Sequence, residues 1–294
     1  MTAETGSAIY DLGYARYIGT RGGRYAVLWS LYVFSLRSVF GLGRRNSSKI
    51  VPVALTVVTF IPAGAQLGIA ALATNVIEIF RPEAYYGFIN WTLALFVAAT
   101  STDLVGRDRS SQVLALYFAR GLRRDDYVAA KYAAGVTSLL ALTLLPQALL
   151  FVGNGLAVED VMGYLRRNWG DIPPIAGSAI GLSFYLASLG LVAASLTPRR
   201  SFAAGAIVGY FAISGAVAAA AVEFGGRVLS EWTPLVSAFH VLSGSTYWIF
   251  DAEPSPDGVV GKAGLALGWY AVTLAAVSVG GVLLLIRSYR RLRL

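Results

Sequence analysis

Six long stretches of the sequence carry almost no charge, and they limit what the chain can fold into. Each approaches or exceeds the roughly 20 residues that a helix needs to cross a bilayer. In lipid, every backbone N–H and C=O group must be hydrogen-bonded within the protein, which a helix achieves by itself. We therefore predict an all-α polytopic membrane protein with six transmembrane helices, at residues 50–73, 85–102, 127–152, 173–196, 202–222 and 263–286.

Composition agrees with this class and removes several kinds of chemistry. Hydrophobic residues make up 56% of the 294 residues and the mean hydropathy is +0.62, whereas apolar residues in soluble domains reach about half even when Gly is counted. The chain has no Cys, which excludes disulfides, thiolate metal sites and thiol nucleophiles. His240 is its single His and leaves little for metal chemistry. We expect no metal and no cofactor bound by this chain.

The basic residues gather on one side of the predicted spans. With both termini, the segment after the second span and the turn at Arg199 on that side, 19 of the 24 Lys and Arg residues lie there. Six of the 16 acids share it, for a net charge of +13, while 5 bases and 10 acids leave the other side at −5. An excess of Lys and Arg marks the cytoplasmic side. We expect a multi-pass protein of the cell membrane with both termini in the cytoplasm, and no nucleic acid as a partner.

Residues 1–49 are expected to form a cytoplasmic lead-in that ends in an interfacial amphipathic helix, Tyr25–Leu42. This stretch is apolar enough to be mistaken for a span, but both of its flanks are basic, so crossing would put one basic cluster on the wrong side. At helical spacing its polar residues form a narrow stripe, and the apolar ones face lipid or the neighbouring spans. Residues 50–294 then form a single six-span domain.

The outer segment Trp232–Phe250 is rich in Leu, Val, Phe, Trp and Tyr but is broken by Pro234, Gly244 and Ser245. It is too interrupted to cross the bilayer and too apolar to lie in water. We expect a re-entrant external helix pair between the fifth and sixth spans, which dips into the outer leaflet and turns back.

The segment Ser101–Lys131, between the second and third spans, carries too many charges to lie in hydrocarbon. Inside it, the apolar run Val113–Phe118 would occupy one side of a short helix, with charges before and after it. One interpretation is a basic loop whose surface helix lies on lipid headgroups. The other is a helix that docks on a partner protein.

The order of residues in this segment resembles the cytoplasmic coupling segment of ABC transporter permeases of the type-2 exporter (ABC-2) family. An acid ends one span, Arg-acid-Arg follows, then a short apolar helix, and then an acid and a Lys open the next span. The matching positions are Asp103, Arg107, Asp108, Arg109, the run Val113 to Leu116, Arg124, Asp126 and Lys131. Ser111 stands where Gly is common in the family, and Gly121 where Pro is common. The order of the spans and the external helix pair resemble the same family.

This resemblance implies the membrane-spanning subunit of an ATP-driven exporter. Such a permease pairs with an identical or related permease and with two cytosolic ABC ATPase subunits, which bind ATP and Mg. The resemblance assigns ATPase coupling to residues in and beside the short helix. The apolar residues would dock on the ATPase, and the charged residues would orient the helix at the membrane edge. These residues are Asp103, Arg107, Asp108, Arg109, Val113, Leu114, Tyr117 and Arg124.

Three other functional classes receive less support from the residues. The run Gly258–Lys262 fails as a phosphate loop in its spacing and in Ala263, where that loop needs Ser or Thr. His240 with Ser243 or Ser245 is the remaining combination for a hydrolase, in a segment where a His is more often an interfacial hydrogen-bonding residue. The spans hold almost no ionisable residues of the kind that ion-coupled transporters use. We therefore expect a transport subunit that is not itself an enzyme.

Polar and aromatic side chains within the spans are candidates for a cargo cavity suited to an amphipathic or apolar molecule. They are Gln66, Asn90, Trp91 and Gln147. The same side chains could instead serve as interhelical hydrogen bonds and packing. The alternative function for the whole chain is a non-transporting membrane anchor or scaffold with a basic cytoplasmic face.

Small residues recur at a spacing of four within the spans, which lets helix backbones approach closely in lipid. The pairs are Gly64 and Gly68, Gly177 and Gly181, Gly205 and Gly209, and Gly264 and Gly268. Packing within the chain is favoured over a dimer contact for each pair.

The charge count leads to a direct test of topology. Single Cys residues introduced at Ser47 or Ser288 should react with a membrane-impermeant maleimide only from the cytoplasmic side, and one at Ser255 only from outside. The absence of native Cys makes the labelling unambiguous. Labelling of Ser47→Cys from outside would mean that Tyr25–Leu42 crosses the membrane.

Overall fold

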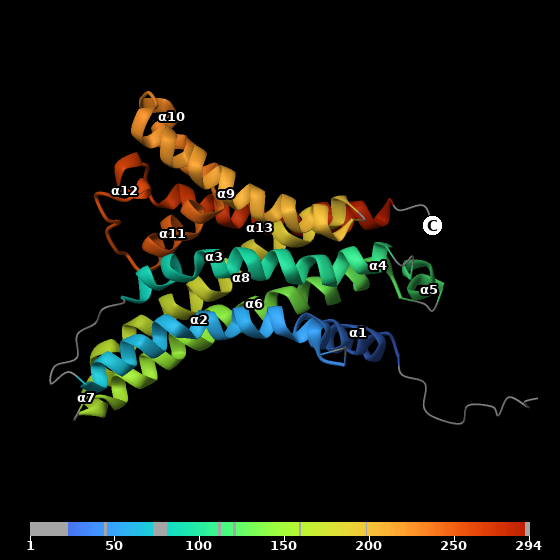
Figure 1. The fold of residues 1–294 in the computed structure, drawn as a ribbon, viewed down its shortest axis with the longest axis horizontal. Coiled ribbons are helices and arrows are strands. Elements are labelled where there is room, and N and C mark those ends of the chain that lie inside the picture. The colour runs from blue at the N-terminus through green and yellow to red at the C-terminus, as the bar shows by residue number, and fades with distance from the viewer. Residues whose placement is uncertain are drawn as a thin grey trace, which may run out of the picture.

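The computed structural model describes residues 23–43, 46–72, 81–110, 113–119, 122–158, 160–197 and 199–291, and every regular element in these ranges is a helix (Figure 1). Six helical segments are long and apolar enough to cross a membrane. They are Ser48–Ala70, Pro82–Gly106, Arg124–Leu156, Val161–Leu196, Arg200–Phe224 and Gly268–Arg290. The prediction of an all-helical chain with six apolar helices of spanning length is confirmed.

The helices follow one another with short connections. They are α1 (Arg24–Val39), α2 (Ser47–Leu72), α3 (Pro82–Ser101), α4 (Arg107–Ser110), α5 (Leu114–Ala119), α6 (Arg124–Leu156), α7 (Val161–Asn168), α8 (Ile172–Leu196), α9 (Arg200–Phe224), α10 (Arg227–Trp232), α11 (Ala238–Ile249), α12 (Val259–Ala263) and α13 (Gly268–Arg290). A π-helical turn at Thr102–Gly106 joins α3 to α4, and 3-10 turns lie at Trp169–Asp171 and Thr233–Val236.

Helices α3, α6 and α8 form the centre of the bundle. Between 50% and 67% of their spanning windows is buried, against 22% for α2, α9 and α13, which lie at the periphery. Helix α6 packs against α1, α2, α8 and α13. The short helices α4 and α5 lie at the end of the bundle where α1 begins and α13 ends, which we call the α5 end; α7, α10 and α12 lie at the opposite end (Figure 1).

Helix α6 is the longest helix that the structure describes, with 33 residues. At 1.5 Å per residue it is about 50 Å long, whereas the hydrocarbon core of a bilayer is about 30 Å thick. Helix α1 runs beside the first turns of α6. Arg24 contacts Asp126 and Tyr32 contacts Thr137, in the same order along both helices. Helix α1 thus packs on the part of α6 nearest the α5 end.

Two elements differ from the sequence prediction. The last long helix begins at Gly268 and not at Ala263, because Gly264 adopts a left-handed conformation (φ 65°) that ends α12. Within Trp232–Phe250 a 3-10 turn containing Pro234 leads into α11, a helix of 12 residues that packs against α3, α8, α9 and α13. Gly244 does not break α11; it lies against the ring of Tyr270, where no side chain would fit.

The close helix contacts occur mostly outside the predicted glycine pairs. A Cβ added to any of Gly64, Gly68, Gly205 and Gly209 would meet no atom of the described residues within 4 Å, so these residues leave the glycine faces of α2 and α9 uncovered. By contrast, a Cβ on Gly281 of α13 would lie 2.6 Å from the Cβ of Ser188 on α8. The hydroxyl of Ser188 donates to the Ser278 carbonyl at 2.9 Å, which fixes this crossing.

We predict that Gly281→Ala destabilises the bundle by about 1–3 kcal/mol, because the added methyl group forces α8 and α13 apart. Gly280→Ala is the matched control, since a Cβ at Gly280 meets no atom within 4 Å and Ala favours a helix. Thermal unfolding of the two variants in the same detergent measures the difference. Equal melting temperatures would show that the crossing is not close-packed.

Candidate functional site

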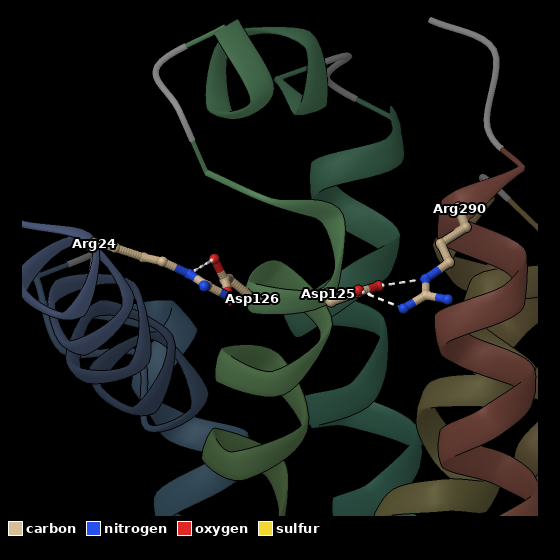
Figure 2. Close-up of polar contacts among 4 residues, drawn as sticks. All are labelled: Arg24, Asp125, Asp126 and Arg290. Carbon is tan, nitrogen blue, oxygen red and sulfur yellow. Dashed lines mark hydrogen bonds and ion pairs between the residues drawn. The ribbon is translucent and has the colours of Figure 1, made fainter.

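Two consecutive carboxylates at the start of α6 reach in different directions and hold two other helices. Neighbouring residues on a helix are about 100° apart around its axis. Figure 2 shows that Asp126 points to Arg24 of α1 and Asp125 to Arg290 of α13. The Arg24 guanidinium donates to Asp126 from Nε at 2.7 Å and from Nη2 at 2.5 Å, and Arg290 donates to Asp125 at 2.8 and 2.6 Å. The first turn of α6 thus connects α1 and α13.

Local electrostatics favour this arrangement. Acids in the first turn of a helix interact well with its positive end, and paired N–H···O bonds between Arg and a carboxylate are strong and directional. The hydrogen bonds from the Arg24 guanidinium to Asp126 raise the pKa of Arg24. Arg124 donates from Nη1 to the backbone carbonyl of Arg290 at 2.6 Å, so it satisfies a carbonyl at the end of α13.

A third ion pair, between Asp108 of α4 and Lys131 of α6, is buried. The Lys131 Nζ lies 2.7 Å from the Asp108 Oδ2, and the two side chains are 4% and 12% exposed. The Tyr127 hydroxyl donates to the same carboxylate oxygen at 2.9 Å. Asp103, in the π-helical turn, pairs with Arg200 at the start of α9. Each of the four acids at the α5 end of the described chain therefore bonds to a base on another helix.

Helix α5 packs on the bundle through the side chains that were expected to bind a partner. Leu114 is only 4% exposed, and the rings of Tyr117 and Phe118 lie 6.1 and 6.0 Å from the ring of Tyr127. Burial, and then the Asp108 carboxylate, raise the pKa of Tyr117, so its phenol stays neutral at physiological pH. The outward face of α5 carries Leu116, which is 66% exposed.

The residues of the predicted coupling set lie in different surroundings. Leu114 and Tyr117 pack against the bundle of their own chain, and Asp108 lies in a buried ion pair with Lys131. Arg107 is exposed on α4, and Val113 precedes α5 and lines a cleft described below. The side chain of Arg109 lies outside the described part of the chain, as do Ser111 and Gly121.

The four candidate cargo residues lie in different surroundings. Gln66 is buried on α2, and Trp91 on α3 is 52% exposed with its ring 4.8 Å from that of Phe239. Gln147 donates from Nε2 to the Pro82 carbonyl at 2.8 Å and borders a cavity of about 70 Å³, which the other three do not line. Asn90, on α3, is half-buried. For Gln147, the interhelical hydrogen bond is the observed role.

A larger apolar groove lies elsewhere, between α8, α9 and α13. It has a volume of about 350 Å³. Its walls are mostly aliphatic and include Val192, Ile207, Val277 and Leu284, with the ring of Phe211. Gly280 also lines it, at a position where the groove leaves room for a side chain.

The sequence did not single out Arg24, Arg200, Arg290, Tyr127 and Tyr289, although they complete the site. The rings of Tyr127 and Tyr289 lie 5.2 Å apart and join α6 to α13 under α5. The available signal was the pair Asp125–Asp126 at the start of a helix, because acids favour that position and neighbouring residues on a helix point in different directions. Which bases are used depends on helices more than 100 residues away in the chain.

Comparison with protein-family models gives no match for this chain, and comparison with curated proteins gives none either. The functional argument therefore uses the residues and their geometry.

The buried and exposed ion pairs should respond differently to loss of one partner. Asp108→Asn leaves the Lys131 ammonium buried without a counter-charge, so we predict a loss of about 3–5 kcal/mol in the free energy of unfolding. Asp125→Asn is the control, because its ion pair with Arg290 is exposed and should contribute little. Thermal unfolding in detergent measures both variants.

A third variant separates charge burial from general damage. Replacing both partners, as Asp108→Leu with Lys131→Met, should recover most of the lost stability, because no unpaired charge remains. If Asp108→Asn and Asp125→Asn were equally stable, the Asp108–Lys131 pair would not be buried in the folded protein.

Proposed function

We propose that this chain is the membrane-spanning permease subunit of an ATP-driven ABC exporter, with separate cytosolic ATPase subunits. The observation that carries the proposal is the structure between α3 and α6. There, a short helix exposes Leu116 on one side and is fixed on the other to the start of a 50 Å helix. A helix that serves only as a linker needs no such attachment.

The contacts at the α5 end provide a route for movement. A push on α5 reaches the start of α6 through the rings of Tyr117, Phe118 and Tyr127. From there, the ion pairs of Asp125 and Asp126 pass the displacement to α13 and α1, and the pair of Asp108 with Lys131 passes it to α4. Closure of two nucleotide-bound ATPase subunits against α5 would in this way change the packing of the spans.

The proposed cargo is apolar or amphipathic and moves outward. The groove between α8, α9 and α13 supports the apolar character of the cargo, because its walls offer contacts to hydrocarbon and few to a polar solute. The outward direction follows from the resemblance to type-2 exporters. In this assignment α5 is cytoplasmic, α1 lies at the inner interface, and the 3-10 turn with α11 forms the re-entrant element of the outer leaflet.

A second permease, identical or related, completes the pathway. The glycine pairs of α2 and α9 support a helix partner from another subunit, because no described residue of this chain lies within 4 Å of a Cβ built at these positions. ATP and Mg belong to the ATPase subunits, since the nearest resemblance to a phosphate loop in this chain, Gly258–Lys262, fails on spacing.

The alternative is a non-transporting membrane anchor or scaffold with a basic cytoplasmic face. The two functions differ in energy use. A permease complex reconstituted in liposomes should hydrolyse ATP faster when its cargo is added, whereas a scaffold should show no hydrolysis coupled to any solute.

We predict that Leu116→Asp weakens binding of the ATPase subunit about tenfold or more, because an unpaired carboxylate placed in an apolar contact costs more than about 1.4 kcal/mol. The complex is purified from its native membranes and photolabelled with azido-ATP. A second, soluble-type polypeptide should carry the label with the wild-type chain and be lost with the variant. Leu229→Asp, at an equally exposed Leu of α10, is the control and should retain it.

If the labelled polypeptide were recovered normally with Leu116→Asp, the proposal that α5 docks on the ATPase would be wrong. Labelling of this chain itself would contradict the assignment of ATP to a partner.

A further inference from the structure

A cleft of about 620 Å³ lies at the α5 end, between α1, α4, α5 and α6. Pockets that hold small molecules in proteins commonly measure about 300–1,000 Å³. One wall is formed by the last turns of α1 and the turn after it, and the opposite wall by α4, Val113 and Tyr117. Lys131 of α6 contributes the floor, where it is paired with Asp108.

The cleft carries a positive charge. Arg37, Arg107 and Lys131 border it together with two acids, Asp103 and Asp108. Both acids are neutralised by bases, since Asp108 pairs with Lys131 and Asp103 with Arg200. Arg37 is exposed and forms no ion pair with any carboxylate of the described residues. The net charge of the bordering residues is therefore positive, and an anion that enters meets the Arg37 guanidinium.

The cleft opens at the level where the spans end. The candidate span of α2 begins at Ser48, five residues after Gly43 of the cleft, and that of α3 ends at Gly106, one residue before Arg107. In a bilayer this is the depth of the lipid headgroups. Basic pockets between transmembrane helices at that depth bind anionic headgroups.

The entrance combines charge with exposed apolar surface. Phe34 lies three residues before Arg37 on α1, so the two side chains share one helix face. Phe34 lines the cleft and is 59% exposed. Aromatic side chains at the membrane interface sit at headgroup level. A molecule with an anionic head and an apolar tail fits this surface better than a free anion does.

We propose that this cleft binds the phosphate headgroup of an anionic phospholipid, with Arg37 as the principal contact and Phe34 against the start of the acyl chains. This inference needs only the candidate spans and is independent of the proposed transport function. A bound headgroup would bridge α1 to α4 and to the start of α5, and so would hold the segment that precedes α6 in place.

Native mass spectrometry of the purified protein provides the test. Phosphatidylglycerol and phosphatidylcholine with identical acyl chains are the probes, added separately to the delipidated protein. The wild-type chain should retain one phosphatidylglycerol molecule under conditions that remove phosphatidylcholine. Arg37→Gln should weaken the apparent affinity for phosphatidylglycerol about tenfold or more, because a charge-assisted hydrogen bond is lost.

Arg287→Gln is the matched control, since Arg287 is also an exposed arginine in the last turn of a helix at the same end. It should bind phosphatidylglycerol like the wild type. Equal loss in both variants, or no preference over phosphatidylcholine, would overturn the proposal. Displacement of the lipid by millimolar inorganic phosphate would assign the cleft to a soluble phosphate ion and would overturn it as well.

Discussion

The α5 end of this bundle depends on where the first turn of α6 places its charges. Asp125 and Asp126 are neighbours in sequence but point in different directions from the helix. Asp125 therefore binds α13, and Asp126 binds α1. Tyr127 follows and supports α5, and Lys131, one turn further, neutralises Asp108. One helix start therefore positions four other elements.

Most of the helical architecture could be predicted from sequence because length and apolarity decide whether a segment can cross a bilayer. The six segments of spanning length follow from that constraint. The exceptions are local. Gly264 separates α12 from α13 through its left-handed backbone, and Gly244 continues α11 where a break was expected, because Tyr270 occupies the space beside it. Hydropathy does not distinguish a glycine that ends a helix from one that accommodates a neighbouring ring.

The candidate site was predicted in place but not in orientation. The sequence placed an apolar helix among charges at residues 113–118, and the structure has α5 there. Which of its faces turns inward depends on Tyr127, on a different helix, so Leu114 and Tyr117 could not be distinguished from Leu116 by pattern. Polarity was one reason for choosing the cargo candidates. In the structure, however, the side-chain amide of Gln147 donates a hydrogen bond to the Pro82 carbonyl. These roles depend on partners that are distant in the sequence. The periodicity of a single segment does not identify those partners.

The π-helical turn at Thr102–Gly106 has a consequence for how such chains are compared. A π turn contains one residue more than an α turn, so it rotates everything after it by about 100° relative to a regular helix. Asp108, whose carboxylate pairs with Lys131, lies two residues after this turn. A relative with identical side chains but one residue fewer in this stretch would turn the same carboxylate away. A sequence alignment that scores residue identity gives a single gap little weight. Such an alignment would pair residues that face different neighbours in the two structures.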